Sequence, residues 1–274
     1  MKSKITMILL LIPLVMFSQS LTLKWEIKDA FKNPETALYS QKGRSIFVSC
    51  INGNMYEKDG NGFISKLSLD GKIEKLNWVE GLNGPKGMDI YEGVIYVTDI
   101  DELVLISMND AKIIKKYKVE GSVFLNDVSI TKDGKVFISD SKANKIFCLA
   151  NGQIKVWLES DKLEKINGML AERNDLLVCS RRIMAIDYQA SKIDTILEAT
   201  GGIDGLERIS GDQFLYSNWD GRIYLTKGKQ LIKLLDTTNE IQQAGDLDFV
   251  RSKKLVVVPT LRGNSVVCYK LKYH

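Results

Sequence analysis

A segment of about 40 residues recurs six times along this chain, and that repetition constrains the fold more than any other feature. Each copy contains a short apolar run that ends in a small or polar residue, as in SIFVSC, VIYVTD and KVFISD. Short strands, Gly-rich turns and a period near 40 residues are typical of a β-propeller with four strands per blade. Aligned on the centre of the apolar run, the copies are anchored by Val48, Val97, Ile138, Val178, Tyr216 and Val258.

The third copy, residues 124–141 (FLNDVSITKDGKVFISDS), shows the strand pattern most clearly. Val128 and Ile130 alternate with polar residues, which is the period of a strand. Asp133-Gly134 separates them from the next apolar run, and Asp-Gly in that position indicates a hairpin because Gly adopts positive φ without steric cost. Each copy therefore contributes an inner hairpin, followed by a third strand and usually a fourth.

The two ends of the chain complement each other. The sixth copy ends after its third strand, and residues 22–27 (TLKWEI) form an alternating segment ahead of the first copy. This segment is expected to supply the missing outer strand, which closes the ring and removes an open sheet edge. We therefore predict an all-β fold in which residues 21–274 form one six-bladed β-propeller with four-stranded antiparallel blades.

Residues 1–20 have the composition of a signal peptide. Lys2 and Lys4 precede an apolar run over residues 5–17, and small polar residues follow. The run is shorter than the roughly 20 apolar residues that span a membrane. We expect cleavage after residue 19 or 20, an exported protein that is periplasmic or secreted, and no stable membrane span afterwards. An uncleaved anchor is the alternative.

Composition excludes several kinds of chemistry. The formal charge of +4 is spread over interspersed lysines and acids without a basic tract, which argues against a nucleic-acid partner. The only histidine is His274, so a Ser-His-Asp triad and a His-ligated zinc or copper site are not available. A general base would be Asp, Glu, Lys, Tyr or a metal-bound water. The cysteines lie far apart in apolar runs and are expected to be free thiols: Cys50, Cys148, Cys179 and Cys268.

A polar residue lies 11 to 13 positions before each anchor, in the loop that enters the innermost strand. In a propeller these loops surround one mouth of the central channel, so the six side chains are expected to converge. Their carboxylate and amide oxygens suit a hard cation. Two other interpretations stay open: a water-filled polar channel, and turn-forming Asn-Gly and Asp-Gly pairs. The six residues are Glu35, Lys86, Asn126, Asn167, Asp204 and Asp246.

Two further segments are expected at the same mouth. Residues 52–62 (NGNMYEKDGNG) contain acids and Asp-Gly but lack EF-hand ligand spacing, so they are interpreted as a long hairpin connection over the channel. Trp219 lies in the Trp-Asp-Gly turn of the fifth copy and is a candidate for the pocket wall.

The motifs PETALYS, FLNDVSITKDGKVFISDS, INGML and GGIDGLERISGDQFLYSNWDGRIY occur in this order along the chain. With them, essentially the whole mature chain resembles the gluconolactonase and regucalcin (senescence marker protein) family of six-bladed propellers. The resemblance implies one axial divalent cation and hydrolysis of sugar lactones or related esters. It implies that Glu35, Asn167 and Asp204 are metal ligands, that Asp204 is also the base, and that Asn126 contacts substrate.

Two positions depart from the family pattern. Phe124 stands where the lactonases often have an Arg, and Glu35 is followed by Thr-Ala-Leu instead of the usual form. The predicted function is a divalent-metal-dependent hydrolase of a sugar lactone or related small ester, with calcium the expected cation and zinc or magnesium as alternatives. Asn126, Lys86 and Asp246 are the predicted substrate-binding residues. The alternative is a non-catalytic propeller that binds a small ligand or partner protein through the same face.

Overall fold

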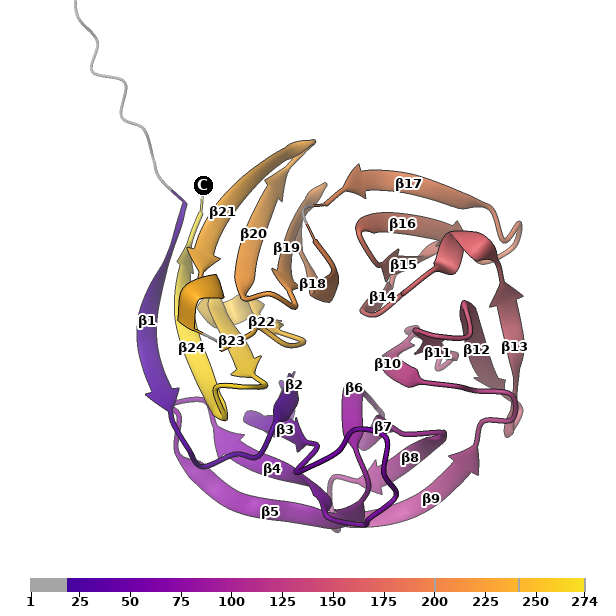
Figure 1. Ribbon diagram of the computed structural model, residues 1–274, viewed down its shortest axis with the longest axis horizontal. Helices are drawn as coiled ribbons and strands as arrows, with labels where there is room; N and C mark the ends of the chain where they lie inside the picture. Colours follow the sequence, from indigo (N-terminus) through magenta and orange to yellow (C-terminus); the bar gives the residue numbers. More distant parts are fainter. Residues whose placement is uncertain (1–18, 200, 241, 274) are drawn as a thin grey trace, which may run out of the picture.

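In the computed structural model, which describes residues 19–199, 201–240 and 242–273, 24 strands form six antiparallel four-stranded sheets. The sheets are arranged as blades around a central channel (Figure 1). In the first five blades the first strand in chain order lies innermost and lines the channel, and the last lies outermost; in the sixth blade β22 is innermost and β1 outermost (Figure 1). The predicted six-bladed propeller is confirmed.

In five blades the strands follow one another in the order of the chain, and in the sixth the first strand of the chain is added on the outside. From the innermost strand outward, the first blade consists of β2 (Pro34–Ser40), β3 (Ser45–Cys50), β4 (Gly62–Ser68) and β5 (Ile73–Leu82), and the second of β6 (Pro85–Tyr91), β7 (Val94–Asp99), β8 (Glu102–Ser107) and β9 (Lys112–Lys118). The third blade consists of β10 (Leu125–Ile130), β11 (Val136–Asp140), β12 (Lys145–Ala150) and β13 (Gln153–Glu159), and the fourth of β14 (Met169–Ala171), β15 (Asp175–Cys179), β16 (Arg182–Asp187) and β17 (Ile193–Glu198). The fifth blade consists of β18 (Ile203–Ser210), β19 (Gln213–Asn218), β20 (Arg222–Lys227) and β21 (Gln230–Asp236), and the sixth of β22 (Asp248–Val250), β23 (Leu255–Thr260), β24 (Ser265–Lys272) and β1 (Ser20–Ile27). Short 3-10 helices occur at η1 (Asp161–Leu163), η2 (Thr238–Glu240) and η3 (Arg251–Lys253).

The sixth blade joins the two ends of the chain. β1 pairs antiparallel with β24, from Ser20 opposite Lys272 to Ile27 opposite Val266. The first strand of the chain is therefore the outermost strand of the last blade, as predicted (Figure 1). Residues 1–18 lie outside the described residues, so most of the predicted signal peptide stays a prediction. Within the described part of the chain, no helix is long and apolar enough to cross a membrane.

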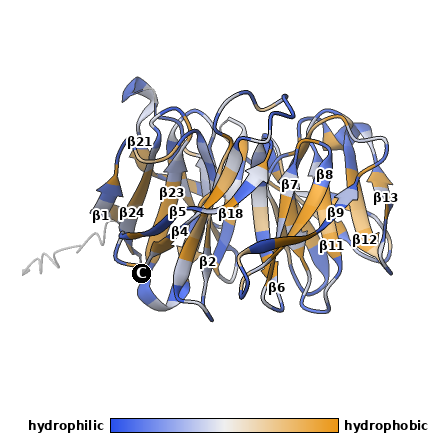
Figure 2. Ribbon diagram, turned by 90° about the horizontal axis from the view of Figure 1, so that it is seen from below, coloured by the Kyte–Doolittle hydropathy of each residue, from blue (hydrophilic) through white to orange (hydrophobic). Residues whose placement is uncertain are grey.

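The core is a ring of six apolar clusters, each between two successive blades. A middle strand is packed on both faces, and all six residues of β3 are buried. This two-sided burial explains why the second strands read as continuous apolar runs instead of alternating. Figure 2 shows apolar residues concentrated along the strands and hydrophilic residues in the connecting loops. All four cysteines are free thiols, as expected.

Hydroxyl groups of second strands connect neighbouring blades beside the channel. The Oγ1 of Thr98 donates to the carbonyl oxygen of Asn126 in the next blade at 2.6 Å. Ser139 Oγ donates in the same way to the carbonyl of Asn167 at 2.9 Å, and Ser217 Oγ to that of Gly245 at 2.7 Å. These bonds fix the residues at the channel mouth relative to one another.

Candidate functional site

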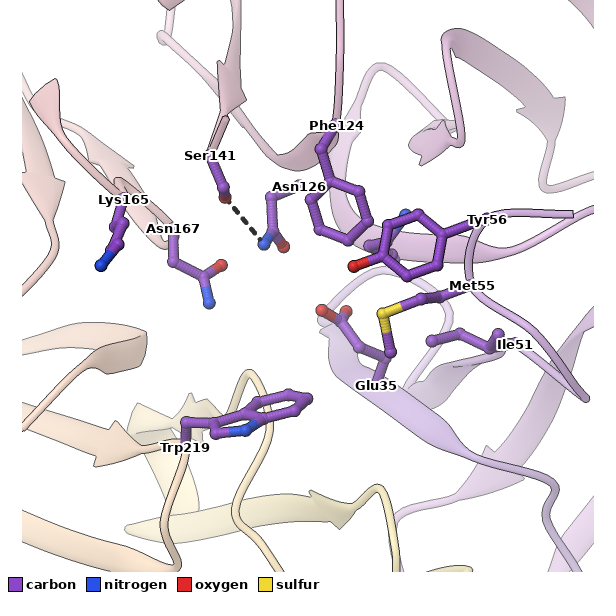
Figure 3. Close-up of a pocket in the computed structure, with 11 residues that line it drawn as sticks. Glu35, Ile51, Met55, Tyr56, Phe124, Asn126, Ser141, Lys165, Asn167 and Trp219 are labelled. Carbon is purple, nitrogen blue, oxygen red and sulfur yellow. Dashed lines mark hydrogen bonds between the residues drawn. The ribbon is translucent and has the colours of Figure 1, made fainter. Parts of the chain in front are cut away.

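A pocket of about 270 Å³ opens at one mouth of the channel (Figure 3). Its lining combines carboxylate, amide and amine groups with aromatic and aliphatic side chains, so it presents both polar groups and apolar surface to a ligand. The lining residues are Glu35, Ile51, Met55, Tyr56, Lys86, Phe124, Asn126, Ser141, Lys165, Asn167 and Trp219.

Lys86 and Asn126 lie at the beginning of strands β6 and β10, not in the loops before them as predicted, and two acidic residues hold the segments that lead into these strands. Asp99, at the end of a second strand, accepts the backbone N–H of Gly84 at 2.7 Å, just before β6. Asp140, at the equivalent place in the third blade, accepts the N–H of Phe124 at 3.1 Å, just before β10. A buried carboxylate that accepts backbone N–H groups forms strong charge-assisted hydrogen bonds. The Thr-Asp and Ser-Asp pairs of the sequence thereby position the pocket residues of their own blades.

Glycine next to a pocket residue allows neighbouring innermost strands to approach closely. A Cβ added to Gly168 would lie 1.9 Å from the carbonyl oxygen of Asp204, and one added to Gly87 would lie 2.3 Å from Asp127 Oδ1. Neither Gly168 nor Gly205 adopts positive φ. The interpretation of Asn167-Gly168 and Asp204-Gly205 as turn-forming pairs is therefore wrong, because these glycines provide space between strands.

The acidic side of the site is built from four blades. Asn167 Nδ2 donates to Asp204 Oδ1 at 2.7 Å, and Thr36 Oγ1 donates to Glu35 Oε2 at 2.7 Å. The same hydroxyl lies 3.3 Å from Asp246 Oδ2. The second oxygen of Asp204, Oδ2, is buried and has no hydrogen-bond partner among the described residues. A buried carboxylate oxygen without a partner is costly, so this atom marks a place for a further group.

Burial and mutual repulsion raise the pKa values of the clustered acids. Burial raises the pKa of Glu35 to about 7, against the opposing effects of the Thr36 hydroxyl and the Lys86 charge. The pKa of Asp204 is held well above its usual range, first by burial and then by the charges of Glu35 and Asp127. The pKa values of Asp127 and Asp246 are raised as well, again chiefly by burial. A cation at this place would offset the repulsion among these acids.

Four of the six predicted residues line the pocket: Glu35, Lys86, Asn126 and Asn167. Asp204 is not among the residues that line the pocket, but it is hydrogen-bonded to the lining residue Asn167 and is almost fully buried. Asp246 does not line this pocket, contrary to the expected convergence, and lines a second cavity deeper in the channel.

The displacement of Asp246 has a structural cause. Gly245 packs against the backbone of Glu35, where an added Cβ would lie 2.4 Å from the carbonyl oxygen. Asp246 forms a parallel bridge with Thr36 instead, one position further along β2. Blade six therefore places its acid one layer below the mouth.

Several contributors were missed or only partly foreseen from the sequence, among them Ile51, Ser141 and Lys165 in the lining. Asp127 follows Asn126 directly, and its carboxylate accepts the N–H of Met169 in the next blade at 2.6 Å. Met55 and Tyr56 come from the long β3–β4 connection, which reaches the pocket as expected for residues 52–62. The Tyr56 ring lies 5.1 Å from that of Phe124. Met55 and Tyr56 are hydrophobic residues in an otherwise polar loop, and this pattern could have indicated that they contact the pocket.

The oxygen donors fit a hard cation. Glu35, Asn167 and Asp204 offer two carboxylates and one amide; Asn167 is hydrogen-bonded to Asp204, whose Oδ2 has no partner among the described residues. Within the described residues no group of three or more His, Cys, Asp or Glu side chains is arranged to hold a metal. That finding does not address the predicted set, because one of its three members is an amide.

No protein-family model matches this chain, and no curated protein matches it. Among solved structures, the chain is similar to a virginiamycin B lyase from Staphylococcus aureus, with a TM-score of 0.65, 14% identity, and coverage of 93% of this chain and 100% of the other. A catalytically inactive histidine-to-alanine variant of a virginiamycin B lyase from the same organism, with quinupristin, has a TM-score of 0.64 and 13% identity, and the match covers 93% of this chain and 100% of the other. A streptogramin B lyase has a TM-score of 0.67 and 12% identity, and the match covers 93% of this chain and 98% of the other. At such identity the likeness shows the fold alone.

Proposed function

We propose that this chain is an exported, divalent-cation-dependent hydrolase of a sugar lactone or related small ester. The observation that carries the proposal is the buried Asp204 Oδ2, which has no hydrogen-bond partner in the described structure and lies close enough to Glu35 and Asp127 for their charges to raise its pKa. Calcium is the preferred candidate because carboxylate and amide oxygens are its usual ligands, with zinc or magnesium as alternatives.

Each residue has a distinct part in this proposal. Glu35, Asn167 and Asp204 would hold the cation, which supplies Lewis acidity toward a carbonyl oxygen and lowers the pKa of bound water. Glu35 lines the pocket, so its carboxylate is open to both the cation and a ligand. A bound cation would lower its pKa from the value of about 7 to which burial raises it. Asp204, predicted as the base, is buried and hydrogen-bonded to Asn167, and is better placed as a ligand.

Asn126 is proposed to orient the substrate. Its Nδ2 donates to Ser141 Oγ at 3.0 Å, as the dashed line in Figure 3 marks. That bond fixes the amide plane and leaves Oδ1 available to a hydroxyl or N–H of the ligand. Orientation of the substrate by fixed groups contributes to catalysis by lowering the entropy cost of reaching the transition state.

The similar structures are lyases, and one of them is inactive when a histidine is replaced by alanine. The only histidine in this chain is His274, which lies outside the described residues. Acid–base chemistry at the pocket would instead use a carboxylate, and this favours the hydrolase over a histidine-dependent lyase.

A non-catalytic ligand-binding propeller is the second candidate. It is favoured by Lys86, whose amine lies close enough to Glu35 to lower the pKa of that carboxylate. A positive charge at this distance opposes a second cation. In this alternative the pocket would bind a small ligand or partner without turnover.

The deciding experiment measures hydrolysis of a panel of sugar lactones and aryl esters with calcium and after treatment with chelator. The hydrolase proposal expects turnover of at least one panel member, lost with chelator and restored by calcium. Turnover that is unaffected by chelator would reject cation dependence. Absence of both turnover and calcium binding in the folded protein would favour the non-catalytic candidate.

A further inference from the structure

Lys86 is a buried amine that faces the pocket without an ion-pair partner. Its side chain is 2% exposed and lines the pocket. Its closest polar contact is the carbonyl oxygen of Gly84 at 3.4 Å, and its Nζ lies 4.5 Å from the centroid of the Phe124 ring. Within the described part of the chain no carboxylate forms an ion pair with it. A buried charge without a partner is costly, so this geometry calls for an anion.

The nearby carboxylates are already committed to other donors. Asp99 and Asp140 act on Lys86 electrostatically, but Asp99 accepts the N–H of Asn83 at 3.0 Å and Asp140 accepts that of Val123 at 2.6 Å. Glu35 accepts the Thr36 hydroxyl. Burial, the largest effect, lowers the pKa of the Lys86 amine, against the charges of Glu35, Asp99 and Asp140; within the described residues none of these carboxylates forms an ion pair with it.

Apolar side chains surround the space in front of this amine. In Figure 3 Trp219 lies on the opposite side of the pocket from Phe124 and Tyr56. Met55 and Ile51 complete the apolar wall on the Tyr56 side. Aromatic faces on two sides of a pocket favour a flat, apolar ligand body.

We propose that Lys86 is the anion-recognition group of this pocket, so that the ligand carries a carboxylate attached to a flat apolar body. The carboxylate supplies the ion pair that Lys86 lacks, and the ring occupies the space between Trp219 and Phe124. As a statement about the substrate, this rests on the proposed hydrolase function and selects a small ester with an aromatic carboxylate over a sugar lactone. As a statement about binding, it requires neither turnover nor a particular cation.

The test compares benzoate with its neutral isostere benzamide by calorimetric titration of the purified protein in calcium-containing buffer. Wild type is expected to bind benzoate at least about tenfold more tightly than benzamide, because a charge-assisted hydrogen bond replaces an unpaired buried charge. Lys86→Met should remove that preference. Lys165→Met is the matched control, since Lys165 also lines the pocket but is exposed and paired with Glu164, and it should keep the preference within about threefold.

Equal affinities of wild type for the two probes, or no binding of benzoate, would overturn the proposal without any need for a variant. A preference retained in Lys86→Met would also overturn it and would assign the carboxylate to another group, such as the cation. The hydrolase proposal can fail independently of this one. In that case the protein would lack calcium binding or turnover but would still prefer benzoate to benzamide.

Discussion

The two ends of the central channel both contain buried acids, but they use them differently. At the far end, Asp89 accepts the N–H groups of Ile90 and Ile130, both at 2.7 Å, and Asp248 accepts that of Tyr39 at 2.5 Å. Two of these three bonds cross from one blade to the next. At the mouth, Asp204 Oδ2 has no partner within the described structure.

Raised pKa values do not distinguish the two ends. Burial raises the pKa of Asp89 to about 7 and that of Asp248 to about 6, close to the value of about 7 for Glu35 at the mouth. What differs is whether the oxygens are satisfied by backbone donors. In this fold an unfilled hydrogen-bonding position is a better guide to function than a shifted pKa, because structural acids shift as well.

The largest effect is expected from removing the charge of Asp204. In Asp204→Asn, calcium affinity should fall by more than about a hundredfold, equivalent to about 2.7 kcal/mol, because a ligand charge is lost. The melting temperature of the chelated variant should be equal to or above that of wild type, since repulsion with Glu35 and Asp127 is relieved. Calorimetric titration and thermal unfolding measure the two quantities.

The matched control at the other end of the channel is Asp248→Asn. This change should leave calcium affinity within about threefold of wild type and lower the melting temperature, because the Tyr39 N–H loses a charged acceptor. If the two variants lost calcium affinity equally, the distinction between the two ends of the channel would be wrong.

A smaller effect is expected from filling the space between innermost strands. Gly168→Ala should destabilise the protein by about 1–3 kcal/mol, because its Cβ would meet the Asp204 carbonyl oxygen at 1.9 Å. Gly202→Ala is the control: an added Cβ there has no heavy atom within 4 Å, and Gly202 does not adopt positive φ. Denaturant unfolding compares the two, and equal stabilities would show that the strands can separate at no cost.

The smallest effect is a pH dependence of stability. Because the folded-state pKa values of Glu35 and Asp89 are raised, the native state binds more protons than the unfolded state, and stability falls as pH rises. From pH 6.0 to 7.5 each group should contribute a loss of about 1 kcal/mol, or roughly 2–4 °C in melting temperature.

Calcium separates the two contributions to this pH dependence. A bound cation at the mouth should remove the part due to Glu35 and leave the part due to Asp89 at the far end. Thermal unfolding with calcium and with chelator measures both parts. Identical pH profiles under the two conditions would contradict the proposed cation site.

The fold was predictable because two-sided burial produces the same apolar second strand in every blade. The convergence of Glu35, Lys86, Asn126 and Asn167 was predictable as well, since each lies 11 to 13 positions before the anchor of its blade. The deeper position of Asp246 could not be predicted, because it depends on contact between Gly245 and a strand about 210 residues earlier in the chain.

Other features of the site arise from contacts between distant segments. The position of Tyr56 depends on Phe124 and Lys142 in the third blade, and Lys142 Nζ lies 3.3 Å from the Tyr56 hydroxyl. The isolation of Lys86 depends on which donors its neighbouring carboxylates already serve. Neither property is encoded in a local pattern of residue types.

The pairing of β1 with β24 also determines when the site comes into existence during folding. The ring closes only after the last strand is available, and contacts of such sequence separation form late and slowly. The same closure brings the N–H of Asp246 to the carbonyl of Glu35 at 2.9 Å and fixes the first blade against the sixth. The inner hairpins can form one by one during synthesis, whereas the arrangement of Glu35 with Asn167 and Asp204 requires the complete ring. Cation binding would therefore report completed folding, and an unfinished chain would lack the site.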